Sequence, residues 1–394
     1  MPQPVYRLGA TGPAVAEIRS RLAHLGLLPH APDSAGTGSG YDDATFDLEV
    51  DHAVRAFQQQ RAVTADGIVG PQTWRLLDDA RWSLGDRVLQ LSVSHHQTGD
   101  DIAELQQRLL DMGFDAGRVD GIFGRSTEHA LREFQRNFGL SDDGTAGPAT
   151  YAALARLART VRGGTPHALR ESEQIRSSGP GLAGKVVVLD PGHGGLERGC
   201  TGYGLTEAEV AQDLAVRIEG RLVALGVRAY LTRGRLSPDV APPDESERAA
   251  FANATNADLV LSLHCDGAPA SGSEARGVAT YYYGVGAHPW GGGGAYSATG
   301  HQFAGLLQRE LVARTDLLDC GIHGKTWDLL RRTRMPAVRL EVGYLTHPGD
   351  AARLADAAFR DTVAEAATIA VQRLFLPPED DHPTGVLRLP ELIR

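Results

Sequence analysis

The chain has 394 residues, of which 42% are hydrophobic and 22% charged, and its formal net charge is −10. This composition is that of a folded globular protein with room for two or three domains. The acidic balance, with no long run of Lys or Arg, argues against nucleic acid as a partner, and no stretch approaches the ~18 apolar residues of a membrane span.

The first residues, MPQPVYRLGATGPAVAEIRSRL, lack the basic and apolar segments of a secretory signal. Cys200, Cys265 and Cys320 are odd in number and far apart, which suits a reducing compartment better than a disulfide framework. We therefore expect a cytoplasmic location for the sequence as written. A place in the cell wall would require export by another route.

The front of the chain contains an internal repeat. Residues 15–27 share their apolar spacing with residues 102–114, and residues 53–77 match residues 130–154. The spacing predicts three short helices in each copy. Each DGxxGP stretch predicts a glycine turn, and the proline is suited to open the last helix. The first copy carries an extra turn-rich stretch at 29–46, which is expected to be a loop.

These repeats, with FQ followed by DGxxGPxT, resemble the peptidoglycan-binding domain 1 family of small three-helix modules. The resemblance covers residues 8–157 and implies a surface for peptidoglycan. The alternative is that the repeated glycines and aromatics only hold a small helical bundle together.

From Lys185 onward, short apolar runs alternate with stretches of helical periodicity. The expected strands are residues 185–190, 227–233, 258–266, 277–283 and 337–345, and the expected helices are 206–225, 244–255, 297–315 and 350–374. This alternation predicts an α/β domain with a mostly parallel or mixed central sheet flanked by helices. Chemistry in such sheets gathers at the carboxyl ends of the strands.

Four polar residues lie near such strand ends or helix starts. His193 directly follows the first strand in DPGHGG, and His264 lies near the end of LVLSLHCD. Glu207 opens a helix, and Glu341 interrupts the apolar strand AVRLEVGYL. A buried ionised carboxylate costs several kcal/mol unless it is paired, protonated or near a metal. Two histidines and a carboxylate are a ligand set of catalytic zinc, and a further carboxylate would supply the base.

Taken singly, each residue also has a purely structural explanation. His193 could be a turn residue, His264 a hydrogen-bonded core histidine, and Glu207 a favourable charge in the first turn of a helix. Glu341 is harder to explain in this way, because its strand is apolar on both sides.

Four segments resemble the zinc-dependent N-acetylmuramoyl-L-alanine amidases of the amidase_3 family. They are DPGHGG (190–195), LTEAEVAQDLAVRI (205–218), ERAAFANATNADLVLSLHCD (247–266) and MPAVRLEVGYLTHPGD (335–350). The resemblance implies that His193, Glu207 and His264 bind zinc and that Glu341 is the catalytic glutamate. It also implies hydrolysis of the amide bond between N-acetylmuramic acid and L-alanine, in peptidoglycan or in muropeptides.

The chain departs from the usual pattern of this family at two places. Asp266 stands where the family has Asn, which adds negative charge near the expected metal. Thr346 and His347 stand where it often has Ser and Asn.

Other residues in the second half invite alternative roles. Three further histidines are expected to be exposed loop residues, the alternative being a second metal site: His288, His301 and His323. The side chain of Cys265 should point away from that of His264, and a structural role is expected for Arg248 and Asn253.

The sequence leaves two functional hypotheses. The first is a zinc amidase tethered to two peptidoglycan-binding modules. The alternative is a catalytically weak or silent cytoplasmic homologue that regulates cell-wall precursor synthesis through contacts with a synthesis protein. The predicted domains are module 1 at 1–82, module 2 at 88–160, a linker at 161–184, the amidase domain at 185–376 and a C-terminal tail at 377–394.

Overall fold

The structure is a computed structural model that describes residues 5–29, 44–92, 95–157, 181–267, 274–284 and 296–376. These residues form two compact units, one holding the two repeats and one holding the α/β domain. Most of the expected loop at 29–46, most of the expected linker, the whole tail, and His288 lie outside the described residues. No helix of the described part is both long and apolar enough to cross a membrane.

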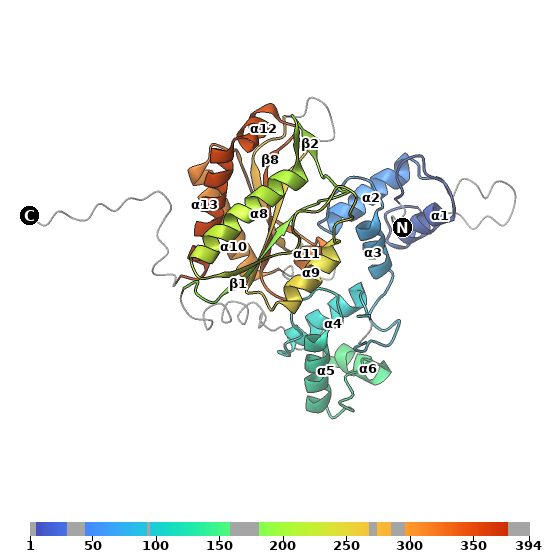
Figure 1. The fold of residues 1–394 in the computed structure, drawn as a ribbon. Helices are drawn as coiled ribbons and strands as arrows, with labels where there is room; N and C mark the ends of the chain where they lie inside the picture. The colour runs from blue at the N-terminus through green and yellow to red at the C-terminus, as the bar shows by residue number, and fades with distance from the viewer. Residues whose placement is uncertain are drawn as a thin grey trace, which may run out of the picture. The chain divides into compact units, whose positions relative to one another are not determined.

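The N-terminal unit is helical, as predicted, with three helices in each repeat (Figure 1). The first repeat forms α1 (Pro13–His24), α2 (Leu48–Gln60) and α3 (Pro71–Asp79), and the second forms α4 (Asp100–Asp111), α5 (Arg125–Asn137) and α6 (Pro148–Leu157). Phe57 and Phe134 are at most 1% exposed and anchor the two small cores. Arg61 joins the repeats through a bidentate ion pair with Asp100, at 2.7 and 2.6 Å.

In the repeated FQ…DGxxGPxT motif, the glutamine side chain forms hydrogen bonds with the DGxxGPxT turn. Gln58 Nε2 donates to Asp66 Oδ1 at 2.8 Å, to the Ile68 carbonyl at 3.0 Å and to Thr73 Oγ1 at 3.1 Å. Its Oε1 accepts a hydrogen bond from the Gly67 amide at 2.9 Å. Gly67 has a φ of 73°, a conformation that favours glycine. We call this arrangement the glutamine clamp.

The second repeat contains the glutamine clamp twice. Gln135 bonds the turn at 143–145, and Gln106 bonds the turn at 120–122, each with the same donor and acceptor pattern. Each clamped glutamine is buried. The polar residues of the motif are therefore engaged with one another, and they explain how the turn forms.

The C-terminal unit is built on a six-stranded sheet with the order β4-β1-β5-β8-β6-β7. The strands are β1 (Val186–Pro191), β4 (Arg228–Leu231), β5 (Leu259–Asp266), β6 (Val278–Tyr283), β7 (Asp319–Lys325) and β8 (Ala337–Tyr344). Strands β4, β1, β5 and β8 are parallel, whereas β6 is antiparallel to β8 and parallel to β7. The predicted mixed, mostly parallel sheet is confirmed.

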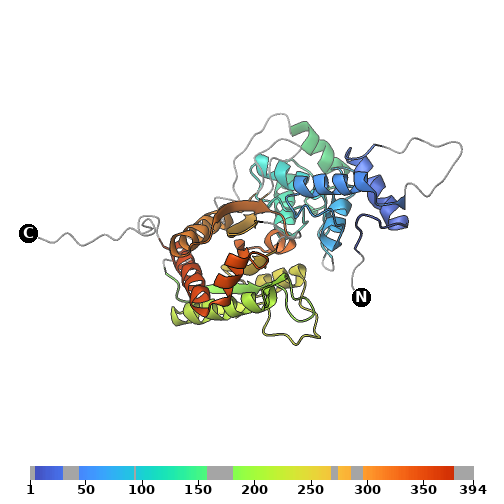
Figure 2. The same ribbon diagram turned by 90° about the horizontal axis from the view of Figure 1, so that it is seen from above.

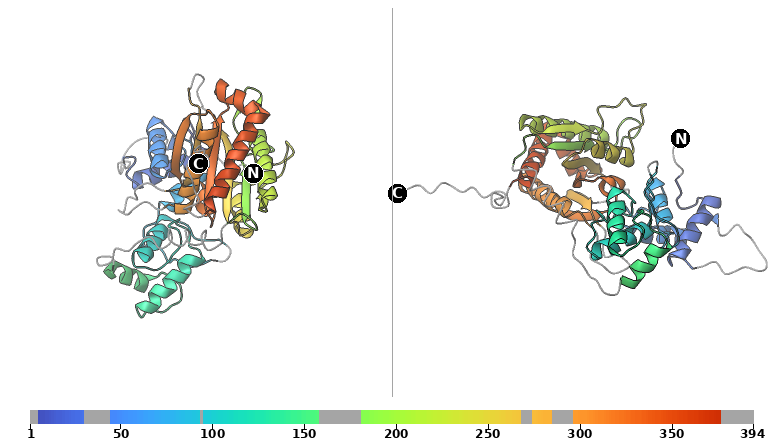
Figure 3. Two further views of the ribbon diagram at one scale, coloured as in Figure 1. Left: turned by 90° about the vertical axis from the view of Figure 1, so that its left-hand side faces the viewer. Right: turned by 90° about the horizontal axis from the view of Figure 1, so that it is seen from below.

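Helices cover both faces of this sheet (Figures 2 and 3). They are α8 (Glu207–Ala224), α9 (Glu245–Ala254), α10 (Ala298–Arg314), α11 (Asp328–Arg332), α12 (Pro348–Ala355) and α13 (Ala357–Leu374). The main apolar core lies between the sheet and the layer formed by α8, α13 and α10. Because side chains alternate along a strand, the polar residues of β1, β5 and β8 face the other side.

Several elements were not predicted. Strand β7 reads DCGIHGK and lacks an apolar run, because it is an edge strand that pairs only with β6 among the described strands. The helix expected over 350–374 is interrupted at Asp356, whose extended backbone ends α12 and whose carboxylate caps α13 at the Ala358 amide. The short hairpin of β2 (Thr201–Gly202) and β3 (Leu205–Thr206) leads directly into α8.

Candidate metal centre

A buried carboxylate holds the end of β1 in place. Asp190 is 0% exposed and accepts hydrogen bonds from Ser262 Oγ and Thr232 Oγ1, both at 2.6 Å, and from Arg248 Nη1 at 2.8 Å. Burial alone would raise the pKa of Asp190, but the Arg248 guanidinium and the two hydroxyl donors lower it below its usual range. Arg248 thus has the structural role that the sequence suggested.

The turn after β1 presents His193 to the edge of the sheet. His193 has a φ of 54°, in the left-handed region, and is followed by two glycines that also have positive φ. Arg233 fixes the turn by donating to the carbonyls of Pro191 at 2.9 Å and Gly192 at 2.7 Å. Gly192 has no room for a side chain, because a Cβ there would lie 2.2 Å from Cε1 of His264.

Glu207 lies between the two histidines. Its Oε1 is 2.7 Å from His264 Nδ1, and its Oε2 is 3.3 Å from His193 Nε2. The amides of Cys200 and Cys265 donate to the two carboxylate oxygens at 2.9 and 3.3 Å. Burial would raise the pKa of Glu207, but the hydrogen bonds with the two histidines lower it far below its usual range, so the carboxylate is ionised.

These three side chains form a cluster that could hold a metal ion. One ligand atom from each of His193, Glu207 and His264 lies within 4.8 Å of the others. Donor atoms around tetrahedral zinc are separated by roughly 3.3 Å, so only small rotations would be needed. Burial and the nearby Arg339 guanidinium lower the pKa of His264 to about 3, which keeps its imidazole neutral. A neutral imidazole and an ionised carboxylate are the forms that bind metals.

Glu341 lies next to this cluster. Strands β5 and β8 are paired so that Glu341 is opposite His264. Glu341 is 6% exposed, and burial, reinforced by the charges of Glu207 and Asp266, raises its pKa to about 7 against the opposing effect of Arg339. Its Oε2 is buried and has no hydrogen-bond partner among the residues that the structure describes.

Arg339 is a residue of this centre that the sequence reasoning missed. It lies two positions before Glu341 on β8 and therefore on the same face. Its Nε and Nη2 both lie 2.7 Å from Glu341 Oε1. Its guanidinium stacks 4.4 Å from the centroid of the Trp327 ring and lies 3.6 Å from Glu245. A cation within a buried strand requires a partner as much as a carboxylate does, and that signal was present in AVRLEVGYL.

Of the two departures from the family pattern, Asp266 lies near the centre and His347 lies at the start of α12. Asp266 Oδ1 accepts a hydrogen bond from the Gly267 amide at 2.7 Å, and its charge contributes to the raised pKa of Glu341. His347 caps α12, its Nδ1 accepting a hydrogen bond from the Asp350 amide at 3.3 Å.

The other residues singled out from the sequence lie elsewhere. Cys265 is buried in the apolar core on the opposite face from His264, as expected. Asn253 bonds the Arg332 carbonyl and the Arg334 amide, which is a structural role. The described residues contain no second cluster of at least three metal-binding side chains: His301 packs against Tyr282, and His323 Nε2 lies 2.7 Å from the Cys320 carbonyl.

Comparisons with known proteins show the family of the chain. The Amidase_3 family model, described as N-acetylmuramoyl-L-alanine amidase, matches residues 187–373, and the peptidoglycan-binding family model PG_binding_1 matches residues 11–77 and 98–154. The N-acetylmuramoyl-L-alanine amidase CwlM of Mycobacterium tuberculosis is 45% identical over 391 residues, which cover 98% of this chain and 93% of that protein. LytC of Bacillus subtilis, an N-acetylmuramoyl-L-alanine amidase, is 30% identical over 47% of this chain and 34% of its own length. Among solved structures, the N-acetylmuramoyl-L-alanine amidase AmiC2 of Nostoc punctiforme is 27% identical, with a TM-score of 0.41, over 48% of this chain and 97% of that one.

Proposed function

The chain belongs to the Amidase_3 family of N-acetylmuramoyl-L-alanine amidases and carries two peptidoglycan-binding modules, and on this premise we propose that it is a zinc hydrolase. Its substrate is peptidoglycan or a soluble muropeptide, cut between N-acetylmuramic acid and L-alanine. The observation that carries the proposal is the cluster of His193, Glu207 and His264 with Glu341 beside it.

The donor set of this cluster favours zinc over other divalent ions. Two imidazoles and one carboxylate leave a fourth tetrahedral position open, which is the arrangement of catalytic zinc sites. Magnesium and calcium prefer sites built almost wholly from oxygen ligands. The three ligands come from the turn after β1, the start of α8 and the end of β5, so the folded sheet sets their separation.

Glu341 is the acid–base residue in this proposal. When bound, zinc supplies a Lewis acid that polarises the amide carbonyl and lowers the pKa of a bound water toward ~7. Glu341 Oε2 accepts the proton of the attacking water, whose oxygen forms a bond to the lactyl carbonyl carbon. The carbon–nitrogen bond then breaks, and Glu341 delivers the proton to the departing nitrogen of L-alanine.

The contact between Arg339 and Glu341 favours a second candidate function. A guanidinium bound to the carboxylate lowers its affinity for a proton and so weakens it as a base. A slow or silent amidase domain would be free to act through contacts with a protein of cell-wall precursor synthesis. The same experiment separates the two candidates.

The test is to incubate the zinc-loaded full chain with a soluble muropeptide and to look by mass spectrometry for free stem peptide beginning with L-alanine. Glu341→Gln is the matched control, because it keeps the shape of the side chain and removes the base. Product from the wild type and none from the variant would support the amidase. No product from either protein, with zinc bound and the fold intact, would reject the amidase and favour the second candidate.

A further inference from the structure

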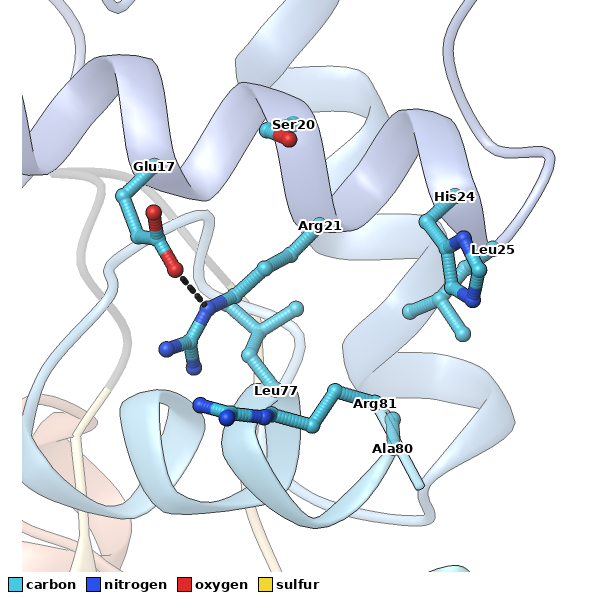
Figure 4. A pocket seen from close by; sticks show the side chains of 8 residues that line it. All are labelled: Glu17, Ser20, Arg21, His24, Leu25, Leu77, Ala80 and Arg81. Atoms are coloured by element: carbon cyan, nitrogen blue, oxygen red, sulfur yellow. Dashed lines mark hydrogen bonds and ion pairs between the residues drawn. The ribbon is translucent and has the colours of Figure 1, made fainter. Parts of the chain in front are cut away.

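The charged groups of the pocket between α1 and α3 are already paired with one another. Figure 4 shows Arg21 bonded to Glu17 in this pocket, and both Arg21 and Arg81 lie 3.2 Å from Asp78 Oδ1. These contacts explain how the two helices pack. The proposed metal cluster differs in this respect, because one nitrogen of His193 faces a carboxylate without a hydrogen bond between them.

His193 is the least confined residue of that cluster. Its side chain is 31% exposed, whereas those of Glu207 and His264 are 4% and 3% exposed. The His264 ring lies against the backbone of Gly192, where no side chain would fit. The His193 ring meets the His264 ring edge to face, with 5.4 Å between the centroids, and is otherwise partly open to solvent. Fixing the His193 ring on a metal would therefore cost more side-chain entropy than fixing the His264 ring.

The two ring nitrogens of His193 face two different carboxylates. Nε2 lies 3.3 Å from Glu207 Oε2 and thus faces the cluster. Nδ1 lies 3.9 Å from Oε2 of Glu197. This separation is longer than a hydrogen bond. The Glu197 side chain is 67% exposed, and its ion pair among the described residues is with His193, so a rotation of this side chain would close the gap.

A tight turn brings Glu197 back to the His193 ring. The Gly194 amide donates to the Glu197 carbonyl at 2.6 Å, and the Glu197 amide donates to the Gly194 carbonyl at 3.0 Å. Within the turn, Gly195 has a φ of 57°, and a Cβ there would lie 1.8 Å from the Val240 carbonyl oxygen. The turn thus requires glycine at this position, and its backbone holds Glu197 beside His193.

We propose that Glu197 positions His193 for metal binding by accepting a hydrogen bond from its Nδ1–H. Histidines that bind metals usually donate from the other ring nitrogen to a carboxylate, a carbonyl or a water. The bond holds the proton on Nδ1, leaves the lone pair of Nε2 directed into the cluster, and limits rotation of the ring. Glu197 is a positioning residue in this proposal, which rests on the proposed function only in taking the cluster as a zinc site.

Glu209 offers a matched comparison for the charge of Glu197. It is an exposed glutamate two residues after Glu207, in the first turn of α8. Its Oε2 accepts a hydrogen bond from Thr206 Oγ1 at 2.9 Å. Glutamine at this position keeps an acceptor oxygen for Thr206 and removes one negative charge from the same part of the domain. Glu209→Gln is therefore the control.

The test is the zinc affinity of the full chain, measured by competition with a chromophoric chelator. Glu197→Gln should bind zinc about 10-fold more weakly than the wild type, because the ring of His193 loses its orienting partner. Glu197→Asp, which keeps the charge, should recover part of the affinity. Glu209→Gln should bind zinc as the wild type does. The melting temperature of metal-free Glu197→Gln should equal that of the metal-free wild type, since the carboxylate acts only when His193 binds the metal.

Three results would overturn this role of Glu197. Equal zinc affinity of the wild type and Glu197→Gln would show that His193 is positioned without it. An equal loss in Glu197→Gln and Glu209→Gln would reduce the effect to general charge. A lower melting temperature of metal-free Glu197→Gln would assign the residue to folding instead. A wild type that binds no zinc would overturn the zinc hydrolase as well, whereas unchanged affinity in Glu197→Gln would overturn the positioning role alone.

Discussion

In the proposed mechanism, Arg339 sets the pH range in which Glu341 can act as a base. The guanidinium lowers the pKa of the carboxylate, while burial raises it to about 7. A base must be ionised, so activity should rise with pH through the pKa of Glu341. A bound divalent ion would lower that pKa further, without changing the sign of the contribution from Arg339.

Replacing Arg339 with Met should therefore move the acidic limb of the pH–rate profile to higher pH. The ion pair that favours the charged carboxylate is lost, whereas the burial that opposes it remains. The measurement is kcat/KM for a soluble muropeptide between about pH 5 and 9, relative to the wild type. Arg334→Met, on an exposed arginine nearby in the sequence, is the control. A profile that falls in height without moving along the pH axis would contradict this role.

The proposed metal ligands can be tested separately from catalysis. Each of His193→Ala and His264→Ala should lower the zinc bound per chain after dialysis, because two remaining ligands hold the ion weakly. Glu341→Gln should retain zinc in the same measurement by inductively coupled plasma mass spectrometry. Full zinc content in both histidine variants would remove them from the ligand set.

At the scale of single residues, the three residues of the cluster were singled out from the sequence, whereas the neighbouring Arg339 was not. His193, Glu207 and His264 stand out because polar side chains end apolar strands or open a helix. Arg339 was overlooked although a cation in a buried strand also requires a partner, because the strand pattern alone does not tell that this partner is Glu341, two positions further on. The unpaired Oε2 of Glu341 likewise follows from packing and not from composition.

At the scale of elements, β1 depends on the buried carboxylate at its end. Asp190 has a lowered pKa, so its stabilising effect is present above the ordinary pKa of an aspartate and is lost as the pH falls through the folded value. At pH 7, Asp190→Ala should lower the free energy of unfolding of the C-terminal unit by about 3–5 kcal/mol, because Arg248 is left buried without its anion.

Urea denaturation of the two proteins, followed by circular dichroism, measures this difference. Asp316→Asn is the matched control: Asp316 also pairs with an arginine, Arg353, but its side chain is 70% exposed. The control should leave the unfolding midpoint unchanged, since exposed ion pairs are screened by solvent. Equal midpoints for Asp190→Ala and the wild type would contradict the importance of the buried network.

The elements that were predicted well are those with a strong apolar pattern of their own. Strands β1, β5 and β8 are buried on both faces, so each reads as an apolar run of the right length. Strand β7 is held by the neighbouring β6 and not by its own residues, and its pattern is correspondingly weak. The break at Asp356 depends on one capping carboxylate within a continuous helical pattern, which periodicity does not detect.

At the scale of the molecule, the chain has separate apolar cores in its two compact units. The metal cluster lies wholly within the C-terminal unit, so metal binding should stabilise that unit alone. Removal of zinc with a chelator should lower the melting temperature of one calorimetric transition and leave the other in place. His264→Ala, scanned with and without zinc, is the control and should not respond. A shift of both transitions would mean that the two units unfold together.

The glutamine clamp has a consequence for how such modules are recognised at all. The repeat is recognised in the sequence by the motifs FQ and DGxxGPxT. The glutamine, aspartate and glycine of these motifs form hydrogen bonds with one another within the turn. A sequence search for these motifs therefore detects the residues that build the turn. It detects, in the same way, modules that bind a ligand and modules that do not bind one. The two copies in this chain share that signature because they build the same turn, so their match reports a common fold and does not by itself identify a ligand.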